Sequence, residues 1–453
     1  MSTAEPLYSR CSKTGDTRAP SLVTCHPSRL IKVKRIVFAT FGSLGDLHPY
    51  VAVARALARR GHRPVIATFE EFRDNVEAAG VGFAPMRPDM GRFGDKAAVI
   101  ERLVDPWRGP ERLIRGMFMP HLRESYADLQ RACEGADLLV THPLAFIGPL
   151  LAQKTGLRWA STALAPMGMF SAIDPPLFPA APWLMQARKL GVAPYRWLFK
   201  LPRAMVRRWE KPLRELRAEL DLPRTDAIAE FEGQFSPLLN LALFSPLLAA
   251  PQADWPAATV TCGFPRYDGA PPDARTREAL ETFLAAGEPP IVFALGSSAV
   301  MVAGNFWRAA ITATQALGRR AILLTGKPPE ELGTVPASVG VFQYLPYSMV
   351  FPRALAIVHS SGIGTLSQAL SAARPQLIVP VAFDQPDNAR RTVALGVARS
   401  VPFQKADATM LALELGALLG TPRLAEQAKI IGERVSGENG ALAAADALEN
   451  VAN

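Results

Sequence analysis

Cysteine and histidine are scarce in this chain of 453 residues, which has four Cys and six His. No two cysteines form a Cys-x-x-Cys pair, and no group of Cys and His has the spacing of zinc ligands. The scarcity excludes a disulfide scaffold and gives no support to a metal site. Because sparse cysteines are typical of a reducing compartment, the sequence predicts a cytoplasmic protein that holds no metal or other cofactor.

Long hydrophobic runs are also missing. The most apolar stretch, residues 237–251, is shorter than the roughly 18 residues that a membrane-spanning helix needs, and Pro246 interrupts it. Residues 1–31 are rich in Ser, Thr, Pro and Arg and lack the apolar core of a signal peptide. We predict a disordered tail there. An over-extended start of the coding region and an organelle-targeting segment are the alternatives.

Negative charge is deficient in one region. The net charge is 50 − 41 = +9, and residues 188–217 hold ten Lys or Arg against two Asp or Glu. One interpretation is a solvated helix face. The other is attraction to an acidic acceptor or to an anionic membrane surface, which would make the protein peripheral at the inner membrane face. No nucleic-acid-binding motif accompanies the charge, so nucleic acid is not a predicted partner.

Strand and helix patterns alternate in two series, one in each half of the chain. In the first half, apolar runs predict strands at 35–40, 63–68, 138–141 and 159–164, and a helix at 51–60. In the second half they predict strands at 291–295, 321–325, 341–344, 357–359 and 377–380, and a helix at 306–317. This alternation indicates two parallel α/β sheets, with a ligand cleft at the carboxyl ends of their strands.

The stretch His359-Ser-Ser-Gly-Ile-Gly-Thr stands where a predicted strand passes into a helix that begins near Gly364 or Thr365. Its glycines let backbone N–H groups approach a ligand, and a helix N-terminus carries the partial positive charge that suits a diphosphate. Thr365 is placed to cap the helix or to bond a ligand oxygen. A tight turn without a ligand is the alternative for this stretch taken by itself.

Other strand ends of the second half add groups that suit a nucleotide sugar. Asp384 and Gln385 follow a predicted strand, and a carboxylate beside an amide can hold sugar hydroxyls. Tyr344 offers a flat aromatic face for a base. Ser297 and Ser298 follow a glycine at the end of a further strand and add two hydroxyls.

These segments resemble the donor domain of the family 1 glycosyltransferases, which have the two-domain GT-B fold. The family pattern is His-His-Gly-Gly-x-Gly-Thr, a Glu or Gln, Gly-Val-Pro-Gln and Asp-Gln-Pro. This chain has His-Ser-Ser-Gly-Ile-Gly-Thr, Gln368, Ala-Arg-Pro-Gln and Asp-Gln-Pro. In the first half, Gly-Ser-Leu-Gly-Asp-Leu-His-Pro at 42–49 resembles the Gly-x-x-Gly-Asp-x-x-Pro turn of bacterial members, and residues 251–269 are similar to the B chain of the rhamnolipid rhamnosyltransferase.

The resemblance implies an α/β protein of GT-B fold, with two Rossmann-like domains facing each other across a cleft. The implied parts are the tail 1–31, an N-terminal acceptor-binding domain 32–265, a C-terminal nucleotide-sugar-binding domain 276–425, and a C-terminal helix 426–453 that packs back toward the first domain. The implied donor-binding residues are Ser297, Ser298, Tyr344, Ser360, Ser361, Gly362, Gly364, Thr365, Gln368, Asp384 and Gln385.

Two of these positions depart from the family pattern. Ser360 stands where many members have a histidine in contact with the diphosphate, and Gln368 stands where many have a ribose-binding Glu. The alignment also makes His359 a structural residue at the strand end. A serine and backbone amides then take the place of a charged ligand.

The same resemblance implies the catalytic groups. Asp46 is the expected general base, and His48 is the alternative base or a partner that orients it. A helix N-cap is the alternative role for Asp46, and a packed or exposed turn residue is the alternative for His48. His142, at the end of another strand, is expected to line the acceptor pocket.

The implied reaction is a single displacement that inverts the anomeric centre. No Asp-x-Asp is present, which argues against a metal-dependent donor site, and helix amides would stabilise the leaving diphosphate instead. The expected donor is a UDP- or dTDP-hexose, with L-rhamnose as one candidate sugar. The expected acceptor is a small hydrophobic or amphiphilic hydroxyl compound such as a hydroxy-fatty acid, polyketide or phenol, held by the Met-, Phe- and Pro-rich residues 164–178 unless these only form core.

Two other functions compete with this one. A nicotinamide-dependent oxidoreductase would need Gly-x-Gly-x-x-Gly after the first strand, and the turn at Gly42 lacks a third glycine at that spacing. A catalytically weak homologue that acts as a helper subunit is motivated by Ser360.

Overall fold

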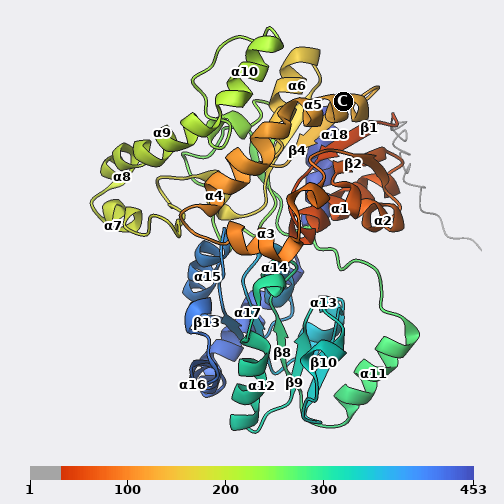
Figure 1. Cartoon of the computed structure of the whole chain (residues 1–453), viewed down its shortest axis with the longest axis vertical. Helices are drawn as coiled ribbons and strands as arrows, with labels where there is room; N and C mark the ends of the chain where they lie inside the picture. The colour runs from red at the N-terminus through yellow and green to blue at the C-terminus, as the bar shows by residue number, and fades with distance from the viewer. Residues whose placement is uncertain (1–31, 453) are drawn as a thin grey trace, which may run out of the picture. The chain divides into compact units, whose positions relative to one another are not determined.

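The structure, a computed structural model, describes residues 32–452 and contains two parallel sheets (Figure 1). The tail predicted for residues 1–31 lies outside the described residues. The strands of the first sheet are β1 (Arg35–Ala39), β2 (Arg63–Thr68), β3 (Gly82–Pro85), β4 (Leu138–Thr141), β5 (Trp159–Ala163), β6 (Asn240–Ala242) and β7 (Thr259–Thr261). Those of the second are β8 (Ile291–Ala294), β9 (Ala321–Leu324), β10 (Val339–Phe342), β11 (Ala356–His359), β12 (Gln376–Ile378) and β13 (Ala398–Ser400).

Both sheets reverse their strand order near the middle. The first has the order β3-β2-β1-β4-β5-β6-β7 and the second β10-β9-β8-β11-β12-β13, with every neighbouring pair parallel. The reversal lies between β1 and β4 in one sheet and between β8 and β11 in the other. Ligands of such sheets bind outside the carboxyl ends of the strands at the reversal. The turns after these four strands therefore form the expected edge of a site.

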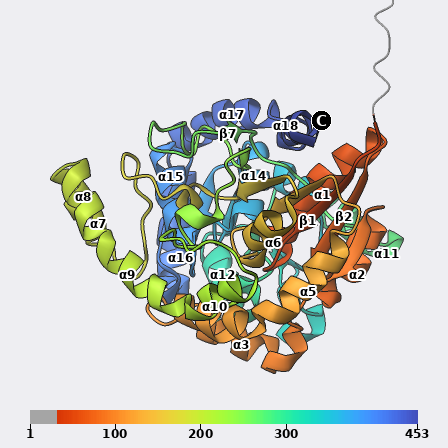
Figure 2. The same ribbon diagram turned by 90° about the horizontal axis from the view of Figure 1, so that it is seen from above.

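Helices connect the strands of both sheets. Those of the first half are α1 (Leu44–Arg59), α2 (Arg73–Ala78), α3 (Lys96–Leu103), α4 (Gly109–Glu111), α5 (Leu122–Ala132), α6 (Ile147–Thr155), α7 (Leu184–Lys189), α8 (Val192–Leu198), α9 (Lys200–Trp209) and α10 (Lys211–Glu219). Those of the second half are α11 (Ala274–Ala285), α12 (Phe306–Ala316), α13 (Tyr347–Val350), α14 (Ile363–Ser371), α15 (Gln385–Ala394), α16 (Ala408–Leu419), α17 (Pro422–Ser436) and α18 (Gly440–Ala452). Seen from above, α7, α8 and α9 lie along one side, away from α1 and α2 (Figure 2).

The continuous apolar strands are explained by burial on both faces of each sheet. In β8, Ile291 and Phe293 belong to one hydrophobic cluster, with side chains of α12 and α16. The alternate residues Val292 and Ala294 belong to another cluster, with Leu280 of α11. Because successive side chains of a strand point to opposite faces, the two clusters show that helices cover both sides of the sheet.

The last helix returns to the first sheet. Glu449 of α18 bonds both Arg60, which follows α1, and His62, each at 2.8 Å. The segment 263–273 connects the sheets in the other direction, from β7 to α11. The chain thus passes between the two sheets twice.

The expected α/β fold with two Rossmann-like sheets is confirmed. The helix expected at residues 51–60 is longer than predicted, because α1 begins at Leu44 inside the glycine turn. Four strands were missed: β3, β6, β7 and β13 have only three or four residues each, too few to show a period. Among residues 32–452, no helix is long and apolar enough to cross a membrane.

Candidate active site

A cavity of about 480 Å³ lies at the carboxyl ends of both sheets. This volume falls in the range of about 300–1,000 Å³ typical of ligand sites. Seven predicted site residues line it: His48, Ser297, Ser298, Tyr344, Gly364, Thr365 and Gln368. The other six, Asp46, Ser360, Ser361, Gly362, Asp384 and Gln385, lie behind or beside its wall.

The turn between β1 and α1 satisfies its own backbone. Ser43 is the N-cap of α1, and its hydroxyl accepts a hydrogen bond from the N–H of Gly45 at 3.2 Å. The carboxylate of Asp46 reaches back and accepts the N–H of Ser43 at 2.7 Å, which completes a capping box. A Cβ on Gly42 would lie 2.3 Å from Asp46 Oδ2, so only glycine leaves room for this carboxylate. The capping alternative for Asp46 is therefore real, although the N-cap itself is Ser43.

His142 faces the other oxygen of the same carboxylate. Its Nε2 lies 3.5 Å from Asp46 Oδ1, and its Nδ1 accepts the N–H of Leu144 at 3.1 Å. Because Nδ1 accepts a hydrogen bond, the hydrogen of a neutral ring is on Nε2 and points to Asp46. His142 lines a smaller cavity of about 90 Å³ and not the large one. It is placed to orient Asp46, whereas the sequence analysis predicted that it lines the acceptor pocket.

His48 lies in the wall of the large cavity beside residues of the segment that joins the sheets. Its ring meets that of Tyr267 edge-on, with ring centroids 5.2 Å apart. Burial lowers the pKa of His48 to about 4, and the opposing effects of the Asp268 charge and a hydrogen bond to the Tyr267 backbone are smaller. Burial therefore keeps the imidazole of His48 neutral, and its edge-on contact with Tyr267 makes it a packed residue of the cavity wall.

The turn between β11 and α14 is built in the opposite way. Its N-cap is Gly362, and no side chain bonds the first N–H groups of the helix. The helix starts at Ile363, so Thr365 lies inside the first turn and does not cap it. Thr365 lines the cavity instead. These free amides at a helix N-terminus are an anion-binding arrangement.

The side chains that precede this helix point into the protein. Ser360 is 1% exposed, and its hydroxyl donates to the carbonyl of Leu295 at 2.6 Å. Ser361 is fully buried with a φ of 69°. His359 bonds Gln376 at 2.9 Å, and burial lowers its pKa to about 4. Any ligand contact of this turn therefore comes from backbone groups rather than from these three side chains.

Asp384 and Gln385 stand behind the same turn. Asn388 donates to both the carbonyl of Ser361, at 3.0 Å, and Asp384 Oδ2, at 2.7 Å. Burial raises the pKa of Asp384 to about 7, and the Asp46 charge adds to the shift. The side-chain oxygen of Gln385 accepts the N–H of Val381 at 2.9 Å, which closes the loop before α15. The amide of Gln385 thus supports the backbone.

Asp268 is a site residue that the sequence analysis missed. Its Oδ1 accepts the side-chain N–H of Gln368 at 2.6 Å, and its carbonyl accepts the hydroxyl of Tyr344. Asp268 also lines the cavity near His48. The contact explains a departure from the family pattern, because a glutamate at 368 would face the Asp268 carboxylate. In the sequence, Asp268 stood out only as part of residues 251–269, whose resemblance to the rhamnosyltransferase B chain assigned it no role.

The apolar side chains of the cavity wall come from several segments, and the predicted segment 164–178 supplies little of them. Four of its apolar side chains are Phe72, Met90, Val99 and Ile100, in and around α3. Of residues 164–178, only Leu164 lines the cavity. The Met- and Phe-rich part forms core: Phe170 packs on Phe178, Phe199 and Phe231. Core packing, the alternative interpretation of this segment, holds for its aromatic rings.

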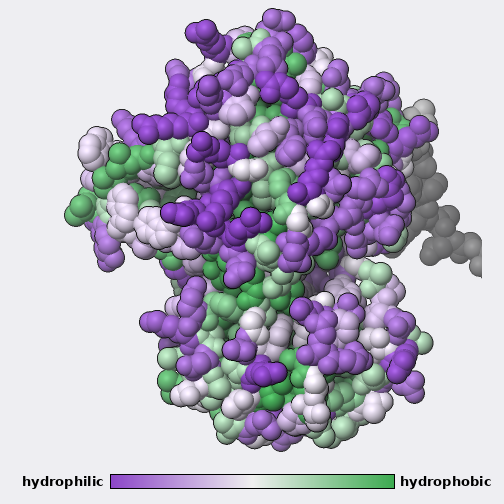
Figure 3. All heavy atoms as spheres, viewed as in Figure 1, coloured by the Kyte–Doolittle hydropathy of each residue, from purple (hydrophilic) through white to green (hydrophobic). Residues whose placement is uncertain are grey.

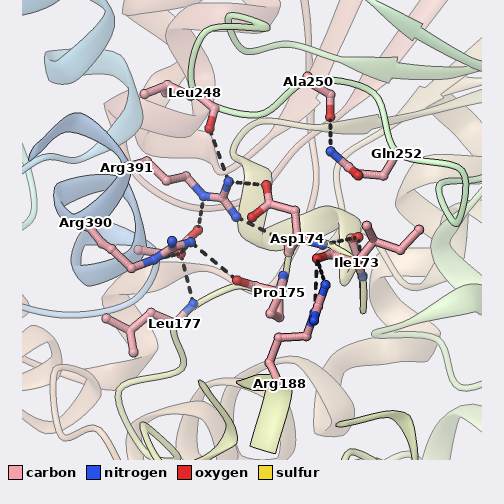
Figure 4. A network of polar contacts seen from close by, with 12 residues as sticks. Ile173, Asp174, Pro175, Leu177, Arg188, Leu248, Ala250, Gln252, Arg390 and Arg391 are labelled. Atoms are coloured by element: carbon pink, nitrogen blue, oxygen red, sulfur yellow. Dashed lines mark hydrogen bonds and ion pairs between the residues drawn. The ribbon is translucent and has the colours of Figure 1, made fainter. Parts of the chain in front are cut away.

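A buried polar network holds the start of α15 to the loop that follows β5 (Figure 4). Arg391 is 6% exposed and donates to Asp387 at 2.7 Å, to Asp174 and to the carbonyl of Leu248 at 3.2 Å. Asp387, fully buried, also accepts the N–H of Leu177 at 2.9 Å. The network therefore ties the helix of Asp384 to the first sheet. It joins residues more than 200 positions apart, and no local pattern of residues indicates such a contact.

Metal ligands were not expected. Within the described part of the chain, no group of three or more His, Cys, Asp or Glu side chains is arranged to hold a metal ion.

Models of two glycosyltransferase domain families match the chain. The family 28 N-terminal domain matches residues 36–123, and the C-terminal domain of the erythromycin biosynthesis protein CIII-like family matches residues 318–444. The O-mycaminosyltylonolide 6-deoxyallosyltransferase of Streptomyces fradiae is 31% identical over 419 residues, which are 90% of this chain and 94% of that protein. The chain belongs to the family 1 glycosyltransferases. It is a hexosyltransferase, and it uses a nucleotide sugar.

Other relatives of this glycosyltransferase are longer proteins. The sterol 3-beta-glucosyltransferase ATG26 of Gibberella zeae is 26% identical, and the match covers 94% of this chain but 30% of that protein. The sterol 3-beta-glucosyltransferase of Candida albicans is also 26% identical, with 91% of this chain and 27% of that protein covered.

Solved structures show the GT-B fold of the glycosyltransferase. The calicheamicin glycosyltransferase CalG4 has a TM-score of 0.66 at 20% identity, over 93% of this chain and 98% of that one. The spinosyn rhamnosyltransferase SpnG, complexed with thymidine diphosphate, has a TM-score of 0.62 at 19% identity, over 92% of this chain and 100% of that one.

Proposed function

We propose that this glycosyltransferase moves a hexose from a dTDP- or UDP-sugar to a hydroxyl of an apolar acceptor, with inversion and without a metal ion. One observation carries the proposal: the two contrasting turns lie next to each other. A Cβ on Gly364, in the first turn of α14, would be 3.6 Å from the Cα of Gly45 in α1. The turn that holds Asp46, through Ser43 and Gly45, and the first turn of α14, through Ile363 and Gly364, therefore border one cavity, with the Asp46 carboxylate just behind its wall.

The proposed chemistry is a single displacement at the anomeric carbon. Asp46 takes the proton of the acceptor hydroxyl, whose oxygen forms a bond to that carbon. The bond from the same carbon to the diphosphate oxygen breaks, and its electron pair leaves with the nucleoside diphosphate. Attack opposite the leaving group inverts the configuration. His142, at 3.5 Å, orients the carboxylate and stabilises its charge before the proton moves.

The free N–H groups at the start of α14 take the role that a metal ion has in other transferases. The partial positive charge of a helix N-terminus is largest within the first turn, where Ile363 and Gly364 line the cavity. Amides held in place before reaction stabilise the charge that develops on the leaving diphosphate.

The donor proposal rests on the relatives and on the cavity. SpnG was solved with thymidine diphosphate, and the Streptomyces relative is by name a deoxyallosyltransferase. A thymine or uracil ring matches the half-exposed ring of Tyr344 in the cavity wall. We therefore place dTDP-6-deoxyhexoses, L-rhamnose included, ahead of UDP-hexoses.

The acceptor proposal rests on the apolar wall. Phe72, Met90, Val99 and Ile100 line this side together with the ion pair of Glu71 and Lys96, so a small apolar or amphiphilic acceptor such as a polyketide, hydroxy-fatty acid or phenol fits there.

A donor screen followed by transfer assays tests the proposal. Thermal shifts of the purified chain with dTDP-, UDP- and GDP-sugars should show the largest rise in Tm for a dTDP-sugar. Incubation with apolar hydroxyl compounds should then add one hexose by mass spectrometry, with NMR showing the inverted anomeric configuration. Added EDTA should leave the rate unchanged.

Three outcomes would contradict parts of this proposal. Transfer that EDTA stops and Mg²⁺ or Mn²⁺ restores would refute the metal-independent site. Retained configuration would refute the single displacement. A Tm rise with GDP-sugars alone would refute the choice of donor.

A further inference from the structure

The helices α7, α8 and α9 carry an exposed apolar stripe that the reaction does not use. Leu190, Trp197, Leu201 and Met205 are 77%, 66%, 61% and 49% exposed. Trp197, Leu201 and Met205 follow one another at intervals of four residues through α8 and α9, where residues Trp197 to Met205 keep near-helical backbone angles, so they lie on one side, and Leu190 ends α7 just before them. In Figure 3 hydrophobic residues gather at the edge that these helices occupy in Figure 1. We call residues 183–209 the basic arm.

Core packing does not explain this stripe. The opposite side of the same helices already packs on the protein through Tyr195, Phe199, Val206 and Trp209, all of them buried. Large apolar side chains of a soluble surface are normally scattered singly, whereas a contiguous set marks an interaction site. The arm therefore has one apolar face for the core and a second for something outside.

The charge of the arm selects its partner. The basic arm, residues 183–209, contains seven Lys or Arg and no Asp or Glu. A basic residue comes directly before each of three stripe residues: Lys189 before Leu190, Arg196 before Trp197 and Lys200 before Leu201. Cations beside the stripe can extend their charged ends past it while their stems lie along the apolar surface.

Part of this charge is left without a counter-ion. Arg203 and Arg207 pair with Glu232 and Asp226, which belong to the following segment. Among residues 32–452, Lys189, Lys200 and Arg208 make no ion pair. Unpaired cations beside exposed Trp and Leu are the pattern of helices that lie in the interface of an anionic membrane.

We propose that the basic arm docks this glycosyltransferase on the surface of an anionic phospholipid bilayer. Trp197, Leu201 and Met205 would enter the interface, and the unpaired cations would contact lipid phosphates. An acidic protein partner would match the charge, but it would not account for a run of apolar residues that stands clear of the core with cations along its flank. The binding is independent of the sugar, the acceptor and the catalytic groups.

Vesicle flotation of the full chain tests this proposal. The protein should float with vesicles of phosphatidylcholine mixed with phosphatidylglycerol, and not with phosphatidylcholine alone. Added salt should release it, since each cation near such a surface contributes about fivefold to binding at low salt. Tryptophan emission should shift to the blue on binding, and lipids carrying a quencher in the acyl chain should quench it.

Two sets of variants separate the contributions, and a third is a matched control. Trp197→Ser with Leu201→Ser and Met205→Ser should weaken binding at least about tenfold and abolish the blue shift. Lys189→Gln with Lys200→Gln and Arg208→Gln should weaken binding and remove its salt dependence. The control pair Leu413→Ser and Ile430→Ser, exposed positions of α16 and α17, should bind like the wild type.

The proposal is overturned if the wild type does not float with anionic vesicles, or if the control weakens binding as much as the arm variants. It is also overturned if the stripe variant floats normally but turns a dimer into a monomer, because a second copy would then cover the arm. Transfer to a water-soluble acceptor should stay at the wild-type rate in all variants. A failure of the proposed chemistry would change that rate and leave flotation intact.

Discussion

Two strand-to-helix turns of this enzyme lie at the reversal of strand order in their sheets, one after β1 and the other after β11, and the N-termini of the helices that follow them differ in how they are capped. Ser43 and Asp46 close the first turn with a capping box. Gly362 opens the second, and no side chain reaches its amides. The same strand-turn-helix motif thus positions a carboxylate at the start of α1 and leaves backbone N–H groups open to a ligand at the start of α14.

The difference shows how one type of turn can supply two different groups to a reaction. The first turn supplies a carboxylate, and the second supplies backbone N–H groups with a partial positive charge. A carboxylate at a helix N-terminus is stabilised by the helix dipole, and at α1 the chain supplies that carboxylate itself. At α14 the N-cap is Gly362, which has no carboxylate, so a diphosphate can bind at this helix N-terminus. Removing the carboxylate from the first turn, or adding one to the second, should therefore lower activity or donor binding.

Removing the charge of the first turn should have the largest effect. Asp46→Asn keeps an oxygen that can accept the N–H of Ser43, so the helix should remain capped, but the amide cannot take a proton. We expect kcat to fall by about 10²–10⁴ while the donor Kd changes little. Asp407→Asn, at the N-cap of α16, is the control for loss of a capping carboxylate and should keep full activity. Unchanged turnover in Asp46→Asn would exclude Asp46 as the base.

Giving the second turn a carboxylate should have the next largest effect. A Cβ at Gly362 has its nearest neighbour, Gln385 Nε2, at 4.0 Å, so a side chain fits there. Gly362→Asp should cap α14 and repel a diphosphate, which weakens donor binding by about tenfold or more. Gly362→Asn caps without a charge and should weaken it less. Calorimetric titration with the nucleoside diphosphate measures both, and equal binding by wild type and Gly362→Asp would refute the diphosphate site.

The smallest effect should be on stability, and it concerns the carboxylate behind the second turn. Burial raises the pKa of Asp384 from 3.8 to about 7, so the folded state keeps a proton that the unfolded chain releases. This stabilisation is complete below about pH 4 and is lost as the pH rises through about 7. From about pH 4 to 7, the free energy of unfolding of the wild type should fall relative to that of Asp384→Asn, by at most about 1.4 kcal/mol per pH unit, and the difference should level off above about pH 7.

Denaturant titrations of both proteins across this pH range check that expectation. Burial also raises the pKa values of Glu210 and Glu230, to about 7 and about 8, so both proteins should lose stability with rising pH. Only the difference between them reports on Asp384. Parallel curves for the two proteins would show that Asp384 ionises in the folded state as it does in the unfolded chain.

The sequence predicted the central strands well because each of them contains an uninterrupted run of at least three apolar residues. The strand expected at 63–68 agrees with β2, and that at 138–141 agrees with β4. The short edge strands β3 and β13 carry too few residues for a period and include Gly, Pro and polar residues. Edge strands are held by their neighbours in the sheet, which a local pattern does not record.

The sequence predicted which turns form the candidate site, but not which side chains contact one another there. Glycines and strand ends located both turns, since those features are local. Whether Ser360 points into the cavity or to the carbonyl of Leu295 depends on a strand 65 positions away. The contact of Gln368 with Asp268 spans 100 positions. Such contacts follow from how the two sheets meet, and no spacing within either segment specifies that.

The capping box also differs from the second turn in how far its parts are spread along the chain. Four consecutive residues, 43–46, contain the cap, the carboxylate and the amides that hold it. The second turn instead needs Leu295, Gln376 and Asn388 from three separate elements. The backbone of the first turn is thus held by its own neighbouring residues, and His142 adds a contact to Asp46 from the end of another strand. The second turn keeps its shape only where the rest of its sheet supplies these distant contacts.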